Sequence, residues 1–289
     1  MRTGAAGARQ AVRSATERLK RAGVPEPAAS AEVLLSELLG IGRAGIALHD
    51  ELLTDEQAAL LYEAWISRRE KREPVQRILG YAYFRNLRLD LDEQTLIPRP
   101  DTESVVEAAL ERIDERREPS CRVLDIGTGS GAIAISIARE RPLCEVHATD
   151  ISEAALQVAR RNAEQNGAAV HFHRADLASG LKFLNGTVDL LVSNPPYVRC
   201  GEIPKLLPEV RDWDPHTALD GGPDGLAYYC RIFAETPPLL RGGADVILEV
   251  GDGQAGAVLE LGSRAGCTPL GSRLVLAGKP RAVLLRWER

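Results

Sequence analysis

The chain has 289 residues and a mass of 31.3 kDa, which is enough for two domains with buried cores. Hydrophobic residues make up 44% of the chain and charged residues 27%, a balance that excludes a largely disordered protein. The formal net charge of −5 argues against a protein whose main task is gripping nucleic acid phosphates, because that task requires a strongly positive surface.

Residues 1–74 are predicted to form a small helical bundle. Apolar side chains recur at helical spacing over residues 31–39, and Gly40 follows where such a helix would end. Thr54 and Gln57 form a capping-box pattern ahead of a second helical run. The segment carries as many basic as acidic side chains and no cluster typical of a catalytic site. It is either a structural bundle or a module that docks a macromolecular substrate, and the residues alone leave both interpretations open.

Residues 75–93 are predicted to form a β-hairpin that links the two halves of the chain. Apolar and aromatic side chains, Val75 and Ile78 among them, alternate loosely with polar ones on either side of Asn86. Arginines lie among the aromatic residues, a pattern that a substrate-facing surface and ordinary hairpin packing explain equally well.

Residues 94–289 are predicted to form an α/β domain with a Rossmann-like, mostly parallel sheet, because short β-rich runs alternate with helical stretches. The candidate strands are Arg122–Asp125, Glu145–Thr149, Val170–His173, Asp189–Ser193, Ala244–Val250, Arg273–Leu276 and Ala282–Trp287, and the candidate helices include Ala132–Arg139 and Glu153–Asn166. In such a sheet the ligand crevice lies at the carboxyl ends of the strands, where the strand order reverses.

The sequence carries no sign of export or membrane insertion. Residues 1–20 lack the apolar core of a signal peptide, and no stretch approaches the roughly 18 apolar residues of a membrane helix. The five cysteines are odd in number and lack the spacing of a zinc site. We therefore expect a cytoplasmic protein with reduced thiols and no bound metal.

A glycine-rich loop follows the first predicted strand of the α/β domain. It consists of Gly127, Thr128, Gly129, Ser130 and Gly131, two residues after Asp125. The next strand ends at Asp150, whose carboxylate can accept hydrogen bonds from both hydroxyls of a ribose. The loop and the strand-end acid together predict a nucleoside-containing cofactor. The G-x-G-x-G spacing differs from the dinucleotide fingerprint and resembles the loop of Rossmann-like methyltransferases, which implies S-adenosyl-L-methionine (AdoMet) as the cofactor.

Asp176 and Leu177 come just after the third predicted strand. In the methyltransferases that the glycine loop resembles, this position lies beside the adenine of AdoMet. There Asp176 would accept a hydrogen bond from the adenine amino group, and Leu177 would cover the ring. The alternative, an aspartate that caps a helix or shapes a turn, is equally compatible with the sequence.

The fourth predicted strand runs directly into Asn194-Pro195-Pro196-Tyr197. Two consecutive prolines cannot continue the ladder of a central strand, so they leave carbonyl groups without partners in the sheet. This happens at the carboxyl end of a strand, where a ligand is expected. A proline-rich turn or a polyproline recognition site is the alternative, and the position after a buried strand argues against it.

The Asn-Pro-Pro-Tyr motif has the groups that methylation of an amide-like nitrogen requires. Such a nitrogen is a poor nucleophile because its lone pair is delocalised, so the site must orient its NH2 group toward the sulfonium methyl. The side-chain oxygen of Asn194 and the carbonyl oxygen of Pro195 can accept from its two N–H bonds. Both hydrogen bonds strengthen as the nitrogen becomes positive, and Tyr197 offers an aromatic face to a flat substrate group. The sequence shows no strong general base.

The sequence resembles the HemK/PrmC family over nearly its whole length. The segments that carry the resemblance are Pro74–Gly80, Thr95–Glu103, the glycine loop, Ser193–Tyr197, Ala218–Leu226 and Leu248–Gly251. The resemblance implies an enzyme that methylates N5 of the glutamine in the Gly-Gly-Gln motif of class-1 peptide chain release factors. It also implies S-adenosyl-L-homocysteine as the second product, and an N-terminal helical domain that helps to bind the release factor.

By the same resemblance, Gly127 to Gly131, Asp150, Leu177 and Asn194 contact AdoMet, while Asn194, Pro195, Pro196 and Tyr197 hold the glutamine. The chain departs from the family pattern at Gly278–Arg281 and at Trp213–Pro215. Both departures lie outside the proposed site, so they put in doubt only local packing or details of partner docking.

Three other functions are compatible with parts of the pattern. Enzymes that methylate exocyclic amines of DNA or RNA bases, of the N6-adenine type, share the Asn-Pro-Pro-Tyr motif. Because residues 1–74 are neutral, the acidic excess falls in the catalytic half, which is the wrong sign for nucleic acid. A methyltransferase acting on a ribosomal-protein glutamine is the second alternative, and the Thr95–Glu103 segment favours the release-factor branch over it. The third is a catalytically dead scaffold, against which the intact motifs argue.

Overall fold

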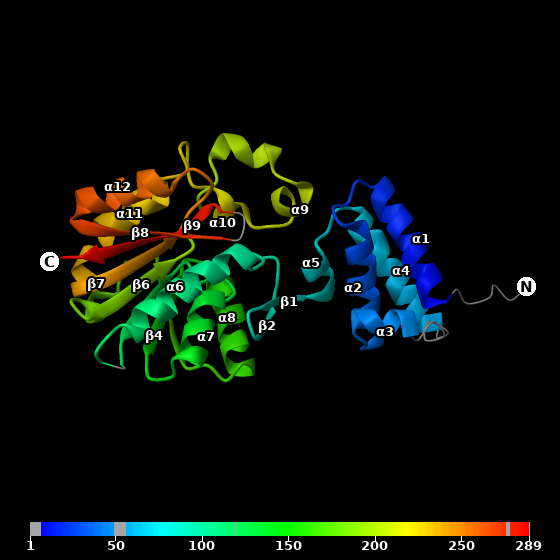
Figure 1. The fold of residues 1–289 in the computed structure, drawn as a ribbon, viewed down its shortest axis with the longest axis horizontal. Helices are drawn as coiled ribbons and strands as arrows, with labels where there is room; N and C mark the ends of the chain where they lie inside the picture. The colour runs from blue at the N-terminus through cyan, green and yellow to red at the C-terminus, as the bar shows by residue number, and fades with distance from the viewer. Residues whose placement is uncertain (1–6, 49–55, 119, 276–277, 289) are drawn as a thin grey trace, which may run out of the picture. The chain divides into compact units, whose positions relative to one another are not determined.

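The computed structural model describes residues 7–48, 56–118, 120–275 and 278–288, and it divides the chain into two compact units. The first unit comprises residues 1–80 together with Leu207–Trp213, and the second comprises Tyr81–Leu206 and Asp214–Arg289. Figure 1 shows the fold of each unit.

The first unit is the predicted helical bundle. Its helices are α1 (Ala8–Arg21), α2 (Pro27–Leu39), α3 (Arg43–Leu48), α4 (Glu56–Glu70), α5 (Val75–Leu79) and the short α9 (Pro208–Arg211). Leu19, Leu34 and Ile66 are among the fully buried side chains of its core. Gly40 ends α2 in the left-handed conformation, as the sequence predicts. Thr54 of the predicted capping box lies outside the described residues.

A returning segment of the chain completes this unit. Glu209 of α9 accepts hydrogen bonds from Arg69 and Arg72, and Arg69 is almost fully buried. Burial lowers the pKa of Arg69, and the neighbouring carboxylate of Glu209 opposes that shift. Because an unpaired buried guanidinium is costly, this ion pair holds Leu207–Trp213 within the bundle.

The predicted hairpin over residues 75–93 is wrong in its first part. Val75–Leu79 form the helix α5, which begins after Pro74 and ends at Gly80 with φ +80°. The spacing of Val75, Ile78 and Leu79 fits a helical turn as well as the loose alternation of a strand, so the pattern alone does not separate the two. The hairpin itself, β1 (Tyr81–Phe84) and β2 (Leu87–Asp90), is antiparallel and belongs to the second unit.

The second unit contains the predicted Rossmann-like sheet of seven strands, in the order β5-β4-β3-β6-β7-β9-β8. The strands are β3 (Arg122–Ile126), β4 (Glu145–Asp150), β5 (Val170–Arg174), β6 (Val188–Ser193), β7 (Leu240–Glu249), β8 (Cys267–Leu274) and β9 (Pro280–Trp287). The first five in chain order pair in parallel, and β9 pairs antiparallel with both β7 and β8. The strand order reverses between β3 and β6, which is where the fold places a ligand crevice.

Helices cover both faces of this sheet (Figure 1). One face packs against α6 (Glu103–Asp114), α7 (Ala132–Glu140) and α8 (Glu153–Gln165), and the hairpin contributes Phe84 and Leu89 to the same apolar core. The other face packs against α11 (Ala227–Glu235) and α12 (Ala255–Ala265). The short α10 (His216–Leu219) precedes α11 in the chain.

Two predicted strands differ from the structure by more than two residues at one end. The strand expected at Arg273–Leu276 begins earlier, at Cys267, and contains Pro269 and Gly271, which a sheet tolerates at its edge. The strand expected at Ala244–Val250 begins at Leu240 and ends at Glu249. Glycines at residues 242 and 243 hide its beginning, since glycine is rare in strand interiors.

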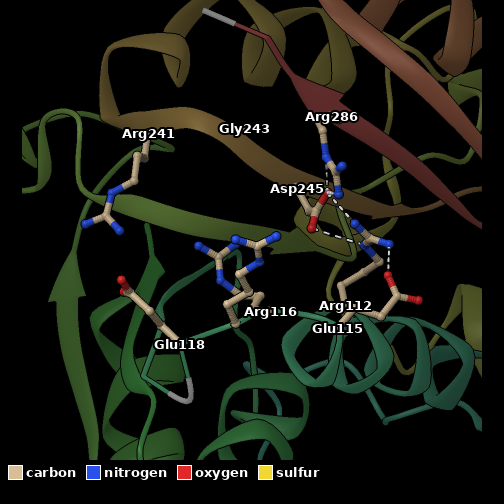
Figure 2. A pocket seen from close by; sticks show the side chains of 9 residues that line it. Arg112, Glu115, Arg116, Glu118, Arg241, Gly243, Asp245 and Arg286 are labelled. Carbon is tan, nitrogen blue, oxygen red and sulfur yellow. Dashed lines mark hydrogen bonds and ion pairs between the residues drawn. The ribbon is translucent and has the colours of Figure 1, made fainter.

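A cavity of about 540 Å³ lies near the amino ends of the parallel strands and not at the predicted crevice. Figure 2 shows Arg112 and Arg286 converging on the buried Asp245 in this cavity. Nearby, Arg116 and Arg241 both donate to the buried Asp189. These ion pairs neutralise one carboxylate at the amino end of β6 and one within β7, so we interpret the cavity as part of the scaffold.

Candidate functional site

The glycine loop presents open backbone to the carboxyl end of the sheet. Gly127, Gly129 and Gly131 have φ values of +72°, +55° and +88°, which only glycine adopts without strain. A Cβ atom built on Gly127 or Gly129 would meet nothing within 4 Å, whereas one on Gly131 would lie 2.6 Å from the Cδ1 atom of Ile135. The first two glycines therefore leave space for a ligand, and the third allows α7 to pack closely.

The two hydroxyl residues of the loop face inward. Thr128 is buried and donates from Oγ1 to Oδ2 of Asp125 at 2.6 Å. Ser130 is also buried, and its carbonyl oxygen accepts from Nδ2 of Asn162 in α8 at 2.9 Å. At Thr128 and Ser130 the loop therefore offers its backbone, and not its side chains, to a ligand.

Asp125 is a buried acid beneath the loop. Burial raises its pKa to about 7, and the hydrogen bond from Thr128 opposes that shift. Its Oδ1 atom has no hydrogen-bond partner among the described residues. A buried oxygen that accepts no hydrogen bond is costly, and the Oδ1 atom of Asp125 is such an oxygen directly below the loop.

Asp150 connects the loop to the end of β4. Its Oδ2 atom accepts from the backbone N–H of Gly129, and its Oδ1 atom accepts from that of Ser152, both at 2.9 Å. Each carboxylate oxygen retains a further lone pair, so both ribose hydroxyls can still be accommodated. Burial raises the pKa of Asp150, with the backbone N–H groups opposing the shift.

Ile151, which sequence reasoning missed, follows Asp150 with 62% of its surface exposed. An exposed isoleucine beside a strand-end acid is suited to cover the flat face of an adenine. The signal was available in the sequence as an apolar residue directly after the acid, outside the predicted strand.

Asp176 and Leu177 form a turn beside Asp150. The N–H of Ala175 donates to the carbonyl oxygen of Asp150 at 3.0 Å, which holds this turn at the carboxyl end of the sheet. Leu177 is buried with a left-handed φ of +50°. Asp176 forms an ion pair with Arg231 of α11 at 3.0 Å. The turn alternative therefore describes its local structure, and a contact with adenine stays a prediction.

The Asn-Pro-Pro-Tyr motif begins beside the glycine loop. Ile126 and Ser193 are paired residues of β3 and β6, so Gly127 and Asn194 each follow one member of this pair. In addition, Oγ of Ser193 donates to the carbonyl oxygen of Ile126 at 2.6 Å. The two segments that the sequence analysis singled out thus begin side by side at the reversal of the strand order.

Asn194 and Pro195 each leave one oxygen atom without a donor. Asn194 donates from Nδ2 to Oγ1 of Thr102 at 3.2 Å, which fixes the orientation of its amide. Its Oδ1 atom and the carbonyl oxygen of Pro195 accept no hydrogen bond from the described part of the chain. These are the two acceptors that the sequence analysis assigns to a substrate NH2 group.

Close packing with three glycines holds Tyr197 in place. A Cβ on Gly221 would lie 2.7 Å from the Tyr197 Cα, one on Gly225 would lie 2.4 Å from its carbonyl oxygen, and one on Gly251 would lie 3.0 Å from its Cδ2. Gln254 donates to the carbonyl oxygen of Tyr197 at 3.0 Å and accepts from the N–H of Gly251 at 2.9 Å. The loop after β6 is therefore braced by the turn after β7.

A second buried acid, Glu249, lies at the end of β7. The hydroxyl of Tyr197 donates to its Oε1 atom at 3.2 Å, and the hydroxyl of Tyr229 donates to its backbone carbonyl. Burial raises the pKa of Glu249 to about 7, while Thr102 and Tyr197 oppose the shift through hydrogen bonds. Burial also raises the pKa of Tyr197, which is therefore a neutral donor. Sequence reasoning gave no role to Thr102 or Glu249, since neither lies near Asn194 in the chain.

Other features of the described chain bear on cofactor and location. All five cysteines are free thiols. Within the described ranges, no group of three or more histidine, cysteine or acidic side chains is arranged to hold a metal ion. None of the described helices is long and apolar enough to cross a membrane.

Comparison with known proteins identifies the two parts of the chain. Residues 10–80 match the family model of the PrmC N-terminal domain, and residues 104–207 match that of the methyltransferase small domain. A methyltransferase structure from Pyrococcus furiosus, at 18% identity, superposes with a TM-score of 0.51 over 81% of this chain and 98% of its own. The chain therefore shares the fold of the class I methyltransferases.

Two curated relatives are much more similar in sequence. The release factor glutamine methyltransferase of Cereibacter sphaeroides is 40% identical over 96% of this chain and 98% of its own length. The enzyme of the same name from Streptomyces coelicolor is 42% identical over 86% of each chain. With both family models matched in order and relatives aligned nearly end to end, the chain belongs to the family of release factor glutamine methyltransferases.

Proposed function

We propose that this enzyme transfers a methyl group from AdoMet to N5 of the glutamine in the Gly-Gly-Gln motif of class-1 peptide chain release factors. The second product is S-adenosyl-L-homocysteine. The observation that carries the proposal is the pair of free acceptors, Oδ1 of Asn194 and the carbonyl oxygen of Pro195, next to the glycine loop. Family membership and the sequence similarity to the curated relatives support the choice of substrate.

The residues present fit AdoMet as the cofactor. The open faces of Gly127 and Gly129 leave room for its methionine part, and Asp150 retains lone pairs for the ribose. Ile151 and Leu177 would cover the adenine from the ends of β4 and β5. When bound, AdoMet supplies an activated methyl group on a positively charged sulfur.

The protein's part in the reaction is to orient the glutamine amide. Asn194 and Pro195 accept hydrogen bonds from the two N–H groups of the glutamine amide, which directs the nitrogen lone pair toward the methyl carbon. In this transfer a bond from the amide nitrogen to the methyl carbon would replace the bond from that carbon to sulfur, and the sulfur would keep the electron pair. The nitrogen then carries a positive charge, so both acceptors bind it more strongly in the transition state than in the ground state. The methylated nitrogen, which is acidic while it carries the positive charge, would finally release one proton to water and return to a neutral amide.

Further parts of the proposal concern partners and location. The helical unit of residues 1–80 with Leu207–Trp213 would contribute to docking of the release factor. A nucleic acid substrate is disfavoured because the acidic excess lies in the catalytic half of the chain. We also expect the enzyme to work in the cytoplasm, where its substrate would be found.

Mass spectrometry tests the proposal directly. The enzyme is incubated with AdoMet and a purified class-1 release factor, and the mass and position of the added methyl group are determined. We expect one methyl group on the Gly-Gly-Gln glutamine and none on a release factor in which that glutamine is replaced. Methylation of ribosomal proteins or of DNA in parallel incubations, with the release factor unmodified, would contradict the proposal.

A further inference from the structure

Two hydrogen bonds behind the Asn-Pro-Pro-Tyr motif hold its two ends, and both lead toward the carboxylate of Glu249. Asn194 donates to Oγ1 of Thr102 at 3.2 Å. The hydroxyl of Thr102 lies close enough to the carboxylate of Glu249 to help hold its pKa down against burial. At the other end of the motif, Tyr197 donates to Oε1 of the same carboxylate at 3.2 Å. Thr102 and Glu249 are 4% and 1% exposed, so bulk water has little access to these contacts.

While Glu249 is ionised, the hydrogen bonds among Asn194, Thr102, Tyr197 and Glu249 can run in only one direction. A carboxylate accepts hydrogen bonds and donates none, so the Tyr197 hydroxyl donates to Glu249, and the Thr102 hydroxyl beside it would orient its hydrogen toward the same carboxylate. The oxygen of Thr102 then presents lone pairs to Asn194, and only the NH2 end of the Asn194 amide can use them. The Oδ1 atom must therefore face the opposite side.

We propose that Thr102 and Glu249 are positioning residues, which hold the Asn194 amide with Oδ1 toward the substrate nitrogen. This inference rests on the proposed function. If the Asn194 amide rotated by half a turn, its NH2 group would face the NH2 group of the glutamine, and two donors would oppose each other. Thr102 and Glu249 would prevent this without touching the substrate.

An ion pair clamps the two segments that carry these residues. Arg281 of β9 donates to Oδ2 of Asp101 at 2.7 Å and to the carbonyl oxygen of Val250 at 3.3 Å. Asp101 precedes Thr102, and Val250 follows Glu249, so one guanidinium holds both neighbours. The Oε2 atom of Glu249 has no hydrogen-bond partner among the described residues. A buried carboxylate that is incompletely paired lowers stability, which fits a residue kept for orientation rather than for packing.

The charge of Glu249 makes the arrangement sensitive to pH. The groups that face it are Tyr197, Tyr229, Asp101 and Arg281, and of these only Arg281 carries a positive charge. Below pH 7 the carboxyl group becomes protonated and can itself donate a hydrogen bond to Thr102. The Thr102 hydroxyl then loses its fixed direction, so we expect kcat to fall as the pH drops below 7.

The sharpest test compares Thr102→Val with Thr102→Ser in the full-length enzyme. Valine keeps the shape of threonine but removes the acceptor for Asn194, whereas serine keeps the hydroxyl. Thr236→Val is the matched control, because Thr236 is equally buried and its hydroxyl bonds only within α11 and the turn that follows it. We expect Thr102→Val to lower kcat at least tenfold, with the KM for AdoMet within about twofold of wild type. Thr102→Ser should recover most of this loss, and Thr236→Val should leave kcat unchanged.

The pH profile of Glu249→Gln provides the second measurement. The wild-type kcat should fall below pH 7, and the contribution of Glu249 to this fall should be absent from the variant. A Thr102→Val enzyme with wild-type kcat, or identical pH profiles for Glu249→Gln and wild type, would overturn the inference. If instead the wild-type enzyme leaves the glutamine unmethylated while the release factor and AdoMet are both bound, it is the proposed function that fails.

Discussion

Asn194 is the residue on which the proposed chemistry depends most directly. Replacing it with alanine removes one of the two acceptors for the substrate nitrogen, and that acceptor strengthens its hold as positive charge develops. We expect Asn194→Ala to lower kcat by about a few hundredfold, the usual consequence of losing one transition-state hydrogen bond. Steady-state kinetics with a purified release factor measures this, and the thermal unfolding midpoint shows that the fold survives. A variant with nearly normal turnover would remove Asn194 from the reaction.

Glu249 should affect stability as well as turnover. Its ordinary pKa of 4.5 is raised to about 7 in the folded protein. Between these two values the folded state keeps a proton that the unfolded chain has released, so the free energy of unfolding falls as the pH rises. The whole effect amounts to roughly 3 kcal/mol above pH 7.

Glu249→Gln cannot ionise and so should lose this penalty. Relative to wild type, the variant should gain several degrees in melting temperature between pH 4.5 and pH 8. Differential scanning fluorimetry at both pH values, without AdoMet, measures the change. Asp125 remains in both proteins, so its own raised pKa cancels in the comparison. A difference in melting temperature that stays constant with pH would show that Glu249 is ionised to the same extent in both states.

At the scale of single residues, the sequence predicted those parts of the site that are contiguous in the chain. Asp150 and Asn194 lie at the ends of recognisable strands, so their place at the crevice follows from the α/β pattern. Thr102 contacts Asn194 although it lies 92 residues before it in the chain. Glu249 contacts Tyr197 although 52 residues separate the two. No local pattern of a single sequence carries such a pairing.

Among the elements, the loop from Asn194 to Tyr197 is held by close backbone contacts with glycines. Gly221 lies under Tyr197 with an ordinary φ, so alanine there would be limited by space alone. Its Cβ would meet the backbone at 2.7 Å, which forces the loop to shift. We expect Gly221→Ala to lower kcat at least tenfold, because small displacements of reacting groups have large effects on rate.

Gly201→Ala is the control for that change. Gly201 follows the same loop, and a Cβ there would meet nothing within 4 Å. This variant should keep a kcat for the release factor close to that of the wild type. Its melting temperature should also stay close to that of the wild type. Equal activity of the two alanine variants would mean that the loop tolerates displacement and does not need its observed position.

The elements that sequence reasoning predicted well are those with one dominant signal. The strands β3, β4, β5 and β6 begin and end within one residue of their predicted bounds, because each is a short β-rich run beside a clear turn. The edge strand β8 was misjudged, since an edge can contain Pro269 and Gly271 that a central strand cannot. The helix α5 was missed because five residues carry too little periodicity to separate a helix from a strand.

For the whole molecule, the division into units changes where the helical part should be cut. The sequence placed the boundary at residue 74, whereas the first compact unit extends to Gly80 and includes Leu207–Trp213. Removing residues 1–80 deprives Glu209 of both arginine partners but leaves the sheet and its crevice complete.

We expect such a truncated enzyme to bind AdoMet with nearly wild-type affinity, measured by calorimetry. It should methylate the intact release factor at least tenfold less efficiently, because the proposed docking surface is gone. A short peptide containing Gly-Gly-Gln should be methylated equally by both enzymes, which separates docking from chemistry. If the truncation left methylation of the intact factor unchanged, the helical unit would have no part in docking.

The position of β9 affects how this protein can be made. β9 comes after β8 in the chain but lies between β7 and β8 in the sheet. While the chain leaves the ribosome, β7 must wait with an open edge until Pro280–Trp287 emerge, and β8 has nothing to pair with before then. A nascent chain in this interval exposes an unpaired strand edge, which favours aggregation. Chaperone dependence should therefore be greatest before Pro280–Trp287 emerge, and chains cut short before β9 should accumulate as insoluble protein.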